Sequence, residues 1–400
     1  MDGSKVVPTE ARDNTQDPHH RQEQDAAQVL HGVQAQEPGQ DSHDGQAQDG
    51  VQLQDGVPVQ EQVLVTADEW FAGGERRWYD PAAALLLRED EASGRTDLLK
   101  VFGRVTRVSA DGSRRSEVEL DPDGGSDEVW LTMLPGFPEG SYGWAQVDRL
   151  LPVGLGPRLY VEPVGQGDSD KPRGYAYSTV ERADLVAAWW QELGVRRTVV
   201  VTFDYTSLAL LELLRRQLER PGEGTTITAA FMVNGGLYPD RHTHPLRGTP
   251  LLRSPLGALV ARRSQQSAVA FGQGFKQAQM YSRGYQVTEA ELVETWSALV
   301  RRDGARFLHE GAGFVKEHRR NGARWDLAAI ARALDGSVSL TVGGSTEDPY
   351  EHRQVAASGT RVPEAEIVTF PGGHLITTEQ PAMFAAVISR IARRHGVLEQ

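Results

Sequence analysis

Apolar side chains follow two alternating patterns from about residue 97 onward. They repeat at helical spacing over Thr179–Leu193, a segment that ends at Gly194. The β-branched run Val199–Val201 comes next and is typical of a strand buried on both faces. A second helical pattern begins directly after Asp204, and Thr226–Val233 is the next strand-like run. Strands that alternate with helices predict a mostly parallel α/β sheet covered by helices on both faces.

The same two periodicities place further elements on either side of this stretch. An antiparallel pair is expected first, where Leu98–Val108 and Ser116–Leu120 flank the turn Ala110-Asp111-Gly112. The other expected elements are the strands Glu128–Leu134, Arg158–Pro163, Val338–Val342 and Glu366–Phe370, and an amphipathic helix over Pro381–His395. The sheet is therefore expected to draw strands from both ends of the folded region.

The pattern changes between Gly235 and about Arg324. Loops rich in Pro, Arg and Gly occur there, followed by helical stretches such as Glu289–Arg301. We interpret residues 235–324 as an insertion that caps the sheet. The core is then expected to consist of residues 61–234 and 325–400.

The first 60 residues carry neither pattern. They are rich in Gln, Asp, Gly and His, contain no aromatic residue, and hold eleven acidic residues against three basic ones. So few large apolar side chains cannot offset the entropy lost on ordering the chain. We therefore expect residues 1–60 to form a disordered tail.

Composition excludes several classes of protein. The chain has no cysteine, which excludes disulfides, thiolate catalysis and cysteine-ligated metal. The net charge of −13 argues against nucleic acid as a partner. No run reaches the roughly 18 apolar residues of a membrane span, and no apolar segment with basic flanks indicates a secretory signal. We expect a soluble cytoplasmic protein.

Two short patterns only partly match the motifs of cofactor or metal sites. Gly165-Gln166-Gly167 lacks the longer glycine pattern of a dinucleotide loop and is interpreted as a turn. Asp240, His242 and His244 alternate on a loop, but their spacing matches no common zinc site. We therefore expect neither a cofactor nor a metal.

The strongest chemical signal is the acid at the end of the Val199–Val201 strand. Asp204 stands where the strand gives way at once to a helix, as on the sharp turn that presents a nucleophile in hydrolases. The positive end of the following helix favours the ionised carboxylate. An Asp in place of a Ser points to attack on an sp³ carbon. An Asp at this place also commonly caps the next helix, so this second interpretation stays open.

Five separate motifs occur along the chain in one order: Leu134-Pro135-Gly136-Phe137-Pro138 with Ser141-Tyr142-Gly143-Trp144; Gly165-Gln166-Gly167-Asp168-Ser169-Asp170-Lys171-Pro172; Phe203-Asp204-Tyr205; Asn234-Gly235-Gly236-Leu237-Tyr238-Pro239; and Gly373-His374 with Glu379-Gln380-Pro381. With these motifs, residues 66–395 resemble the α/β-hydrolases of the epoxide hydrolase and haloalkane dehalogenase group. The mesoderm-specific-transcript-like branch is the more similar one. The resemblance implies an α/β-hydrolase fold, with a mostly parallel eight-stranded sheet and an inserted helical cap.

The resemblance also implies a triad. Asp204 would attack carbon and form an ester, and His374 would then activate the water that cleaves it. A free imidazole titrates near pH 6.5, so a neutral base is expected at pH 7. The acid that orients His374 would be Asp348, with Glu347 as the alternative. His374 as an ordinary loop histidine, and either acid as a solvated side chain, remain open.

The remaining roles are carried over from the same resemblance. The amides of Phe137 and Tyr205 would form the oxyanion hole. Tyr281 and Tyr285 in the cap would donate a proton to the departing alkoxide of an epoxide, although cap tyrosines more often only pack. The expected partners are a small apolar electrophilic substrate and water.

The chain departs from the family at several positions of the site. Pro135 and Phe203 replace the usual histidines before Gly136 and before the nucleophile, and Thr202 and Thr206 replace small residues of the elbow. Phe137 and Tyr205 provide no indole or amide side chain to hold a halide, so epoxide opening is favoured over dehalogenation. Ester cleavage, dehalogenation and a catalytically silent binding protein on the same fold remain the alternatives.

Overall fold

The computed structural model describes residues 64–108, 114–115, 128–238, 240–241, 259, 262–263, 266–311, 317–318 and 320–397. Several predictions lie outside these residues and stay untested. They are the disordered tail of residues 1–60, the turn Ala110-Asp111-Gly112, the strand Ser116–Leu120, and the loop positions His242 and His244.

One sheet runs through the described residues, in the order β10-β9-β8-β7-β5-β6-β3-β1-β2, and a tenth strand, β4, pairs with β3. All neighbours from β10 to β6 are parallel. This parallel part consists of β5 (Val129–Leu134), β6 (Arg158–Val161), β7 (Arg197–Phe203), β8 (Thr226–Val233), β9 (Ser339–Ser345) and β10 (Glu366–Phe370). The predicted mostly parallel α/β sheet is confirmed.

The N-terminal part of the sheet is antiparallel and contains more strands than the one pair predicted. It consists of β1 (Glu75–Asp80), β2 (Leu85–Leu87), β3 (Leu99–Val108) and β4 (Arg114–Arg115). β3 joins this part to the parallel strands by pairing antiparallel with β6. The β1–β2 hairpin is the reason that the sheet has more strands than the eight expected.

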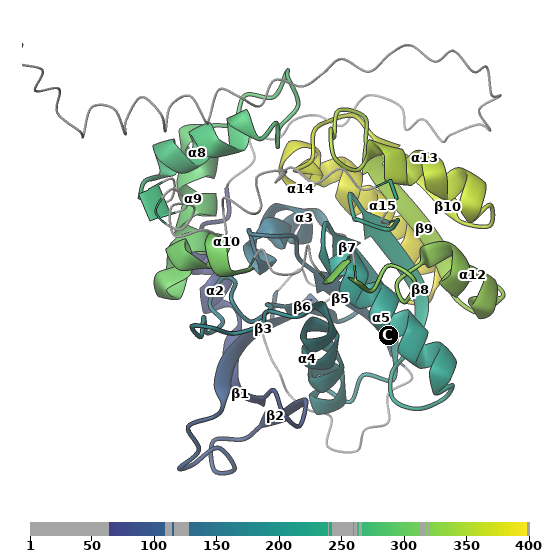
Figure 1. Cartoon of the computed structure of the whole chain (residues 1–400), viewed down its shortest axis with the longest axis horizontal. Coiled ribbons are helices and arrows are strands. Elements are labelled where there is room, and N and C mark those ends of the chain that lie inside the picture. Colours follow the sequence, from purple (N-terminus) through teal and green to yellow (C-terminus); the bar gives the residue numbers. More distant parts are fainter. Residues whose placement is uncertain are drawn as a thin grey trace, which may run out of the picture. The chain divides into compact units, whose positions relative to one another are not determined.

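Helices cover both faces of the sheet, as Figure 1 shows, with α4 and α5 in front of the strands. The buried side chains fall into two apolar clusters, one on each face. One cluster includes α4 (Thr179–Glu192), α5 (Thr206–Glu219) and α12 (Leu327–Leu334), with α13 (His352–Arg361) packed against it. The other includes α2 (Ala67–Ala72), α3 (Ala145–Leu150), α14 (Ile376–Glu379) and α15 (Pro381–Arg394).

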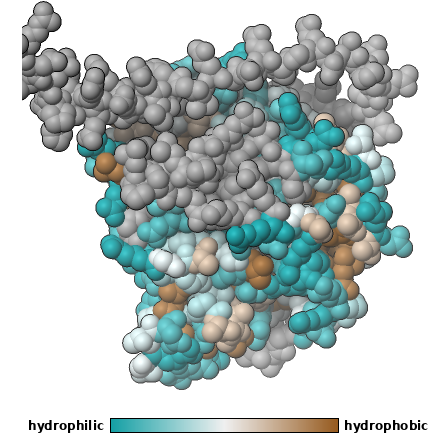
Figure 2. Space-filling view, in the orientation of Figure 1, coloured by the Kyte–Doolittle hydropathy of each residue, from teal (hydrophilic) through white to brown (hydrophobic). Residues whose placement is uncertain are grey.

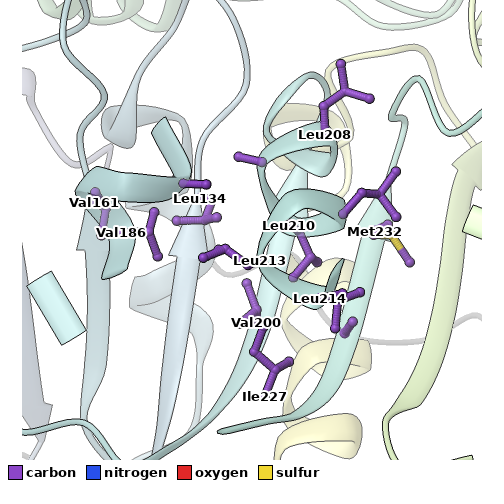
Figure 3. Packing of buried hydrophobic residues seen from close by; sticks show 14 of the residues in the cluster. Leu134, Val161, Val186, Val200, Leu208, Leu210, Leu213, Leu214, Ile227 and Met232 are labelled. Carbon is purple, nitrogen blue, oxygen red and sulfur yellow. The ribbon is translucent and has the colours of Figure 1, made fainter. Parts of the chain in front are cut away.

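The helix that follows Asp204 is firmly packed. Figure 3 shows leucines of α5, among them Leu210 and Leu214, lying over β7 and β8 near Val200 and Met232. All four of these side chains are fully buried. Burying one such side chain contributes about 1.5–3 kcal/mol, so the strand-to-helix connection has a rigid base.

The segment between β8 and α12, predicted to be a cap, contains α8 (Ala268–Gln277), α9 (Glu289–Val300), the 3₁₀ helix η2 (Arg301–Arg306) and α10 (Phe307–Glu310). Figure 1 shows these helices grouped beside α2. Thr288 begins α9 with a capping box that includes Glu291. The N–H of Ala67 at the start of α2 donates to Glu294 Oε2 at 2.7 Å, which ties α9 to the N-terminal helix.

The face shown in Figure 2 is mainly hydrophilic over the described residues, with small scattered apolar areas. Across the part of the chain that the structure describes, no helix combines the length and apolarity needed to cross a membrane.

Candidate active site

Asp204 occupies a strained bend between β7 and α5. Its φ of 55° is unusual for a residue with a side chain, and its N–H donates to the carbonyl of Val233 at 2.9 Å. The N-cap residue of α5 is Tyr205, whose side chain makes no capping hydrogen bond. Asp204 Oδ2 instead accepts a hydrogen bond from the N–H of Phe137 at 2.9 Å. Asp204 is therefore not at the N-cap position of α5, and its Oδ2 faces the loop that carries Phe137.

The structure brings His374 between two carboxylates. Its Nδ1 lies 2.8 Å from Asp348 Oδ2, and its Nε2 lies 3.8 Å from Asp204 Oδ1. All three side chains are buried, with residue exposures of 4% or less. The imidazole is thus aimed at one acid through each nitrogen and is shielded from bulk water.

The two candidate acids have different surroundings. Asp348 is 1% exposed and contacts the imidazole. Glu347 is exposed, and its Oε2 accepts a hydrogen bond from the N–H of Arg283 at 3.1 Å. The geometry therefore selects Asp348 over Glu347 as the partner of His374.

The expectation of a neutral imidazole at pH 7 does not fit this environment. Burial alone would lower the pKa of His374, but the charges of Asp348, Asp204 and Glu351 outweigh burial and raise it to about 9. At neutral pH the free protein therefore holds an imidazolium that is paired with Asp348 and faces Asp204. The pKa of free histidine does not predict the protonation of His374, because three carboxyl groups lie nearby.

The loop that carries Phe137 is held close to the elbow. Gln166 donates from Nε2 to the carbonyl of Gly136 at 2.8 Å, so the predicted turn at Gln166 also supports this loop. A Cβ at Gly136 would lie 2.6 Å from the ring of Phe203 and 3.2 Å from Asp204 Cβ, which leaves room only for glycine. Tyr205, the other predicted oxyanion residue, follows Asp204 directly as the N-cap residue of α5.

The unusual residues of the elbow fit without unpaired polar groups. The hydroxyl of Thr206 shares its one proton between the carbonyls of Leu134 and Phe203, at 3.1 and 3.0 Å. Thr202 Oγ1 lies 3.0 Å from Ser207 Oγ. The ring of Phe203 packs on the imidazole of His374 with centroids 5.3 Å apart. Threonine hydroxyls are therefore bonded where the family has small residues.

The two tyrosines of the predicted cap, Tyr281 and Tyr285, stack on each other with ring centroids 5.5 Å apart. Tyr285 already donates its hydroxyl to Glu291 Oε1 at 2.7 Å. Burial, and next the charge of Glu139, raises the pKa of Tyr281 well above its usual value. The raised pKa keeps Tyr281 a neutral phenol at neutral pH. The hydroxyl proton of Tyr285 is instead used in the hydrogen bond to Glu291.

Sequence reasoning missed a further carboxyl group at the site. Glu139 is 4% exposed, and burial raises its pKa to about 7; the charge of His374 opposes this shift and that of Asp204 adds to it. Glu139 stands directly after Pro138 in the first of the five motifs, but neighbouring sequence gives no sign of its burial.

Asn234, the first residue of the fourth motif, was given no role from the sequence, but it helps to build the site. Its Nδ2 donates to the carbonyl of His374 at 2.7 Å and to Ser345 Oγ at 2.9 Å, and its Oδ1 accepts from Ser345 N–H at 3.0 Å. Asn234 therefore fixes the backbone of the imidazole-bearing turn to the ends of β8 and β9. Its position at the end of a predicted strand was the available signal.

Among the described residues, no group of three or more His, Cys, Asp or Glu side chains is arranged to hold a metal ion.

The comparison with protein families settles which family the chain is part of. The model of the alpha/beta hydrolase family matches residues 133–387, well over half of the chain. The chain belongs to the alpha/beta hydrolase family. The predicted α/β-hydrolase fold is confirmed, and membership of this family supports a hydrolase.

Two relatives show the same likeness at the level of sequence. The mesoderm-specific transcript protein of Mus musculus is 28% identical over 222 residues, which cover 54% of this chain and 63% of the relative. The putative hydrolase LipZ of Mycobacterium tuberculosis is 29% identical over 269 residues, covering 66% of this chain and 88% of the relative. The chain thus spans about 63% of the length of the mouse relative. The predicted resemblance to mesoderm-specific transcript proteins is confirmed.

Solved structures of hydrolases share the fold. An esterase from Thermogutta terrifontis superposes with a TM-score of 0.54 at 14% identity, over 80% of this chain and 98% of the esterase. The haloalkane dehalogenase DatA from Agrobacterium tumefaciens C58 superposes with a TM-score of 0.54 at 16% identity, over 80% of this chain and 97% of the dehalogenase. At these identities the likeness concerns architecture only.

Proposed function

We propose that this hydrolase opens epoxides without a cofactor, through an ester between the substrate and Asp204. One observation carries the proposal: the buried Asp204 carboxylate has Phe137 N–H at 2.9 Å from Oδ2 and His374 Nε2 at 3.8 Å from Oδ1. A carboxylate is nucleophilic at neutral pH without a general base, which suits attack on an sp³ carbon.

In the first step Asp204 Oδ1 attacks an epoxide carbon. A carbon–oxygen ester bond forms while the ring carbon–oxygen bond breaks, and the ring oxygen takes a proton from Tyr281. Oδ2 becomes the ester carbonyl oxygen and keeps its contact with Phe137 N–H. The imidazolium of His374 supplies the proton that restores Tyr281, so both charges of the Asp204–His374 pair disappear together.

In the second step the neutral imidazole takes a proton from water, and the hydroxide attacks the ester carbonyl carbon of Asp204. Phe137 N–H, with the amide of Tyr205, stabilises the oxyanion. Collapse breaks the ester bond: the departing alkoxide takes the proton of the added hydroxyl and leaves as the diol, the Asp204 carboxylate is restored, and the proton taken from water remains on His374. Asp348 holds Nδ1 so that Nε2 faces the ester.

The electrostatics of the pair support this order of events. The charge of Asp204 is one of the causes that raise the pKa of His374 to about 9. Esterification removes that charge, so the pKa of His374 falls at the stage when a neutral base is needed. The free protein thus keeps the imidazole protonated, and the ester intermediate favours its deprotonation.

A silent binding protein on the same fold is the main rival, and the Phe203 ring against His374 is the observation in its favour. Dehalogenation is less well supported, because Phe137 and Tyr205 offer no side-chain N–H to a halide. We also infer that residues 235–324 form the cap over the substrate and that the protein acts in the cytoplasm.

Turnover in heavy-oxygen water tests the ester mechanism. After many turnovers of an epoxide, the peptide that contains Asp204 should gain heavy oxygen, because water attacks the carbonyl carbon of that side chain. Label confined to the diol, with none in this peptide, would contradict an Asp204 ester. A parallel sample without substrate controls for background exchange.

A further inference from the structure

The cap segment of residues 278–283 is bonded to both loops that flank the imidazole. Tyr350 donates its hydroxyl to the carbonyl of Ala278, while the Tyr350 N–H donates to Asp348 Oδ1 at 2.8 Å. On the other side of the site, Leu375 N–H donates to the carbonyl of Met280 at 3.0 Å. The segment that contains Tyr281 is therefore attached to the core beside the base.

Glu379, the last residue of α14, makes the densest set of these contacts. Its Oε1 accepts hydrogen bonds from Ser282 N–H at 2.8 Å and from Gly373 N–H at 3.2 Å. Its Oε2 accepts a hydrogen bond from Ser282 Oγ at 2.6 Å. One carboxylate therefore holds the cap residue after Tyr281 and the core residue before His374.

The cap and core backbones touch at this place. A Cβ on Gly373 would lie 2.4 Å from Ser282 N and 2.6 Å from the carbonyl carbon of Tyr281, so a side chain would force them apart. His374 is thus preceded by a residue bonded to Glu379 and followed by Leu375, which is bonded to the cap itself. A shift of this cap segment therefore displaces the turn that carries the imidazole.

We propose that Glu379 is a positioning residue that sets Tyr281 of the cap and His374 of the core in one fixed arrangement. This inference rests on the proposed function, in which Tyr281 serves ester formation and His374 serves ester hydrolysis. Glu379 touches neither substrate nor the reacting atoms; it acts through Ser282 and Gly373. A displacement of about 1 Å in such groups can slow a reaction about 100-fold.

The test compares Glu379→Ala with Glu379→Gln. Alanine removes all three hydrogen bonds. The amide oxygen of glutamine can accept from both N–H groups, and its amide nitrogen can donate to Ser282 Oγ. With styrene oxide as the probe, rapid quenching and intact-mass measurement give the rates of ester formation and ester decay separately.

We expect Glu379→Ala to slow both half-reactions about 10- to 100-fold, and Glu379→Gln to restore both to within about threefold of wild type. Ser282→Ala removes only the Oγ bond and should slow both about threefold; it replaces Glu379→Ala if that variant does not fold. Glu364→Ala, at an exposed position before β10, is the matched control.

The outcomes separate the inference from the proposed function. Wild-type protein that forms the ester, with unchanged rates in folded Glu379→Ala, overturns the inference alone. A lower melting temperature without a change in either rate does the same, because it reveals a merely structural contact. Wild-type protein that forms no ester overturns the proposed function, and this inference falls with it.

Discussion

The buried carboxyl of Glu139 gives the clearest quantitative prediction. Burial, opposed by the charge of His374 and reinforced by that of Asp204, raises its pKa from 4.5 to about 7. One pKa unit corresponds to about 1.36 kcal/mol, so ionising Glu139 in the folded protein costs about 3 kcal/mol more than in the unfolded chain. Because the folded-state pKa is the higher one, the stabilising contribution is complete below pH 4.5 and is lost as the pH rises through 7.

Glu139→Gln removes the ionisation and nearly keeps the shape of the side chain. The difference in free energy of unfolding between variant and wild type should therefore move by about 3 kcal/mol in favour of the variant between pH 4.5 and 8, with most of the change above pH 5. Urea unfolding at four pH values, followed by the fluorescence of the eight tryptophans, measures this difference.

Glu223→Gln is the matched control, because Glu223 is exposed in the turn after α5. Its unfolding free energy should follow the wild-type pH dependence. A Glu139→Gln protein with the same pH dependence as wild type would refute the reasoning, since Glu139 would then titrate alike in folded and unfolded chains.

Other predictions address the triad, the oxyanion loop and the core. Asp348→Asn removes the charge that chiefly raises the pKa of His374 and should slow ester hydrolysis about 1,000-fold, so that the ester accumulates in intact-mass spectra. Single-turnover ester decay between pH 6 and 10 should rise with pH to a midpoint below about 9, because the ester has lost the Asp204 charge; a midpoint at or above 9 contradicts this. Gln166→Ala frees the Gly136 carbonyl and should slow ester decay about tenfold while ester formation changes less. Glu212→Ala leaves Arg215, Arg216 and Arg324 without their buried carboxylate and should cost about 3–5 kcal/mol in urea unfolding, whereas exposed Glu219→Ala should cost under about 1 kcal/mol. Equal losses for these two glutamates would contradict that assignment.

The central parallel strands, such as β5 and β7, were predictable because their apolar runs are buried on both faces. Thr226–Val233 and Glu366–Phe370 have the predicted bounds, and β7 extends the Val199–Val201 run at both ends. The β1 strand escaped prediction, because Glu75–Asp80 is mostly half-buried in the antiparallel part of the sheet and carries four charged residues among six. Local charge hides a strand whose stability comes from pairing with β3.

The sequence could predict those site residues whose place follows from their position at the end of a strand. Asp204 follows β7 and His374 follows β10, and the ends of parallel strands meet at one edge of the sheet. Asp348 and Glu347 are adjacent in sequence, so only burial and side-chain direction distinguish them. The raised pKa of Glu139 depends on burial, and that of His374 depends on carboxyl groups that come together only on folding.

The central claim is that Asp204 becomes covalently attached to the substrate. The direct measurement is peptide mass spectrometry of His374→Ala protein after incubation with a panel of epoxides and haloalkanes. The account predicts a stable adduct of one epoxide on the peptide that contains Asp204, because the step that releases it has lost its base. An adduct on another residue, or none while wild-type protein converts the same epoxide, would contradict the account.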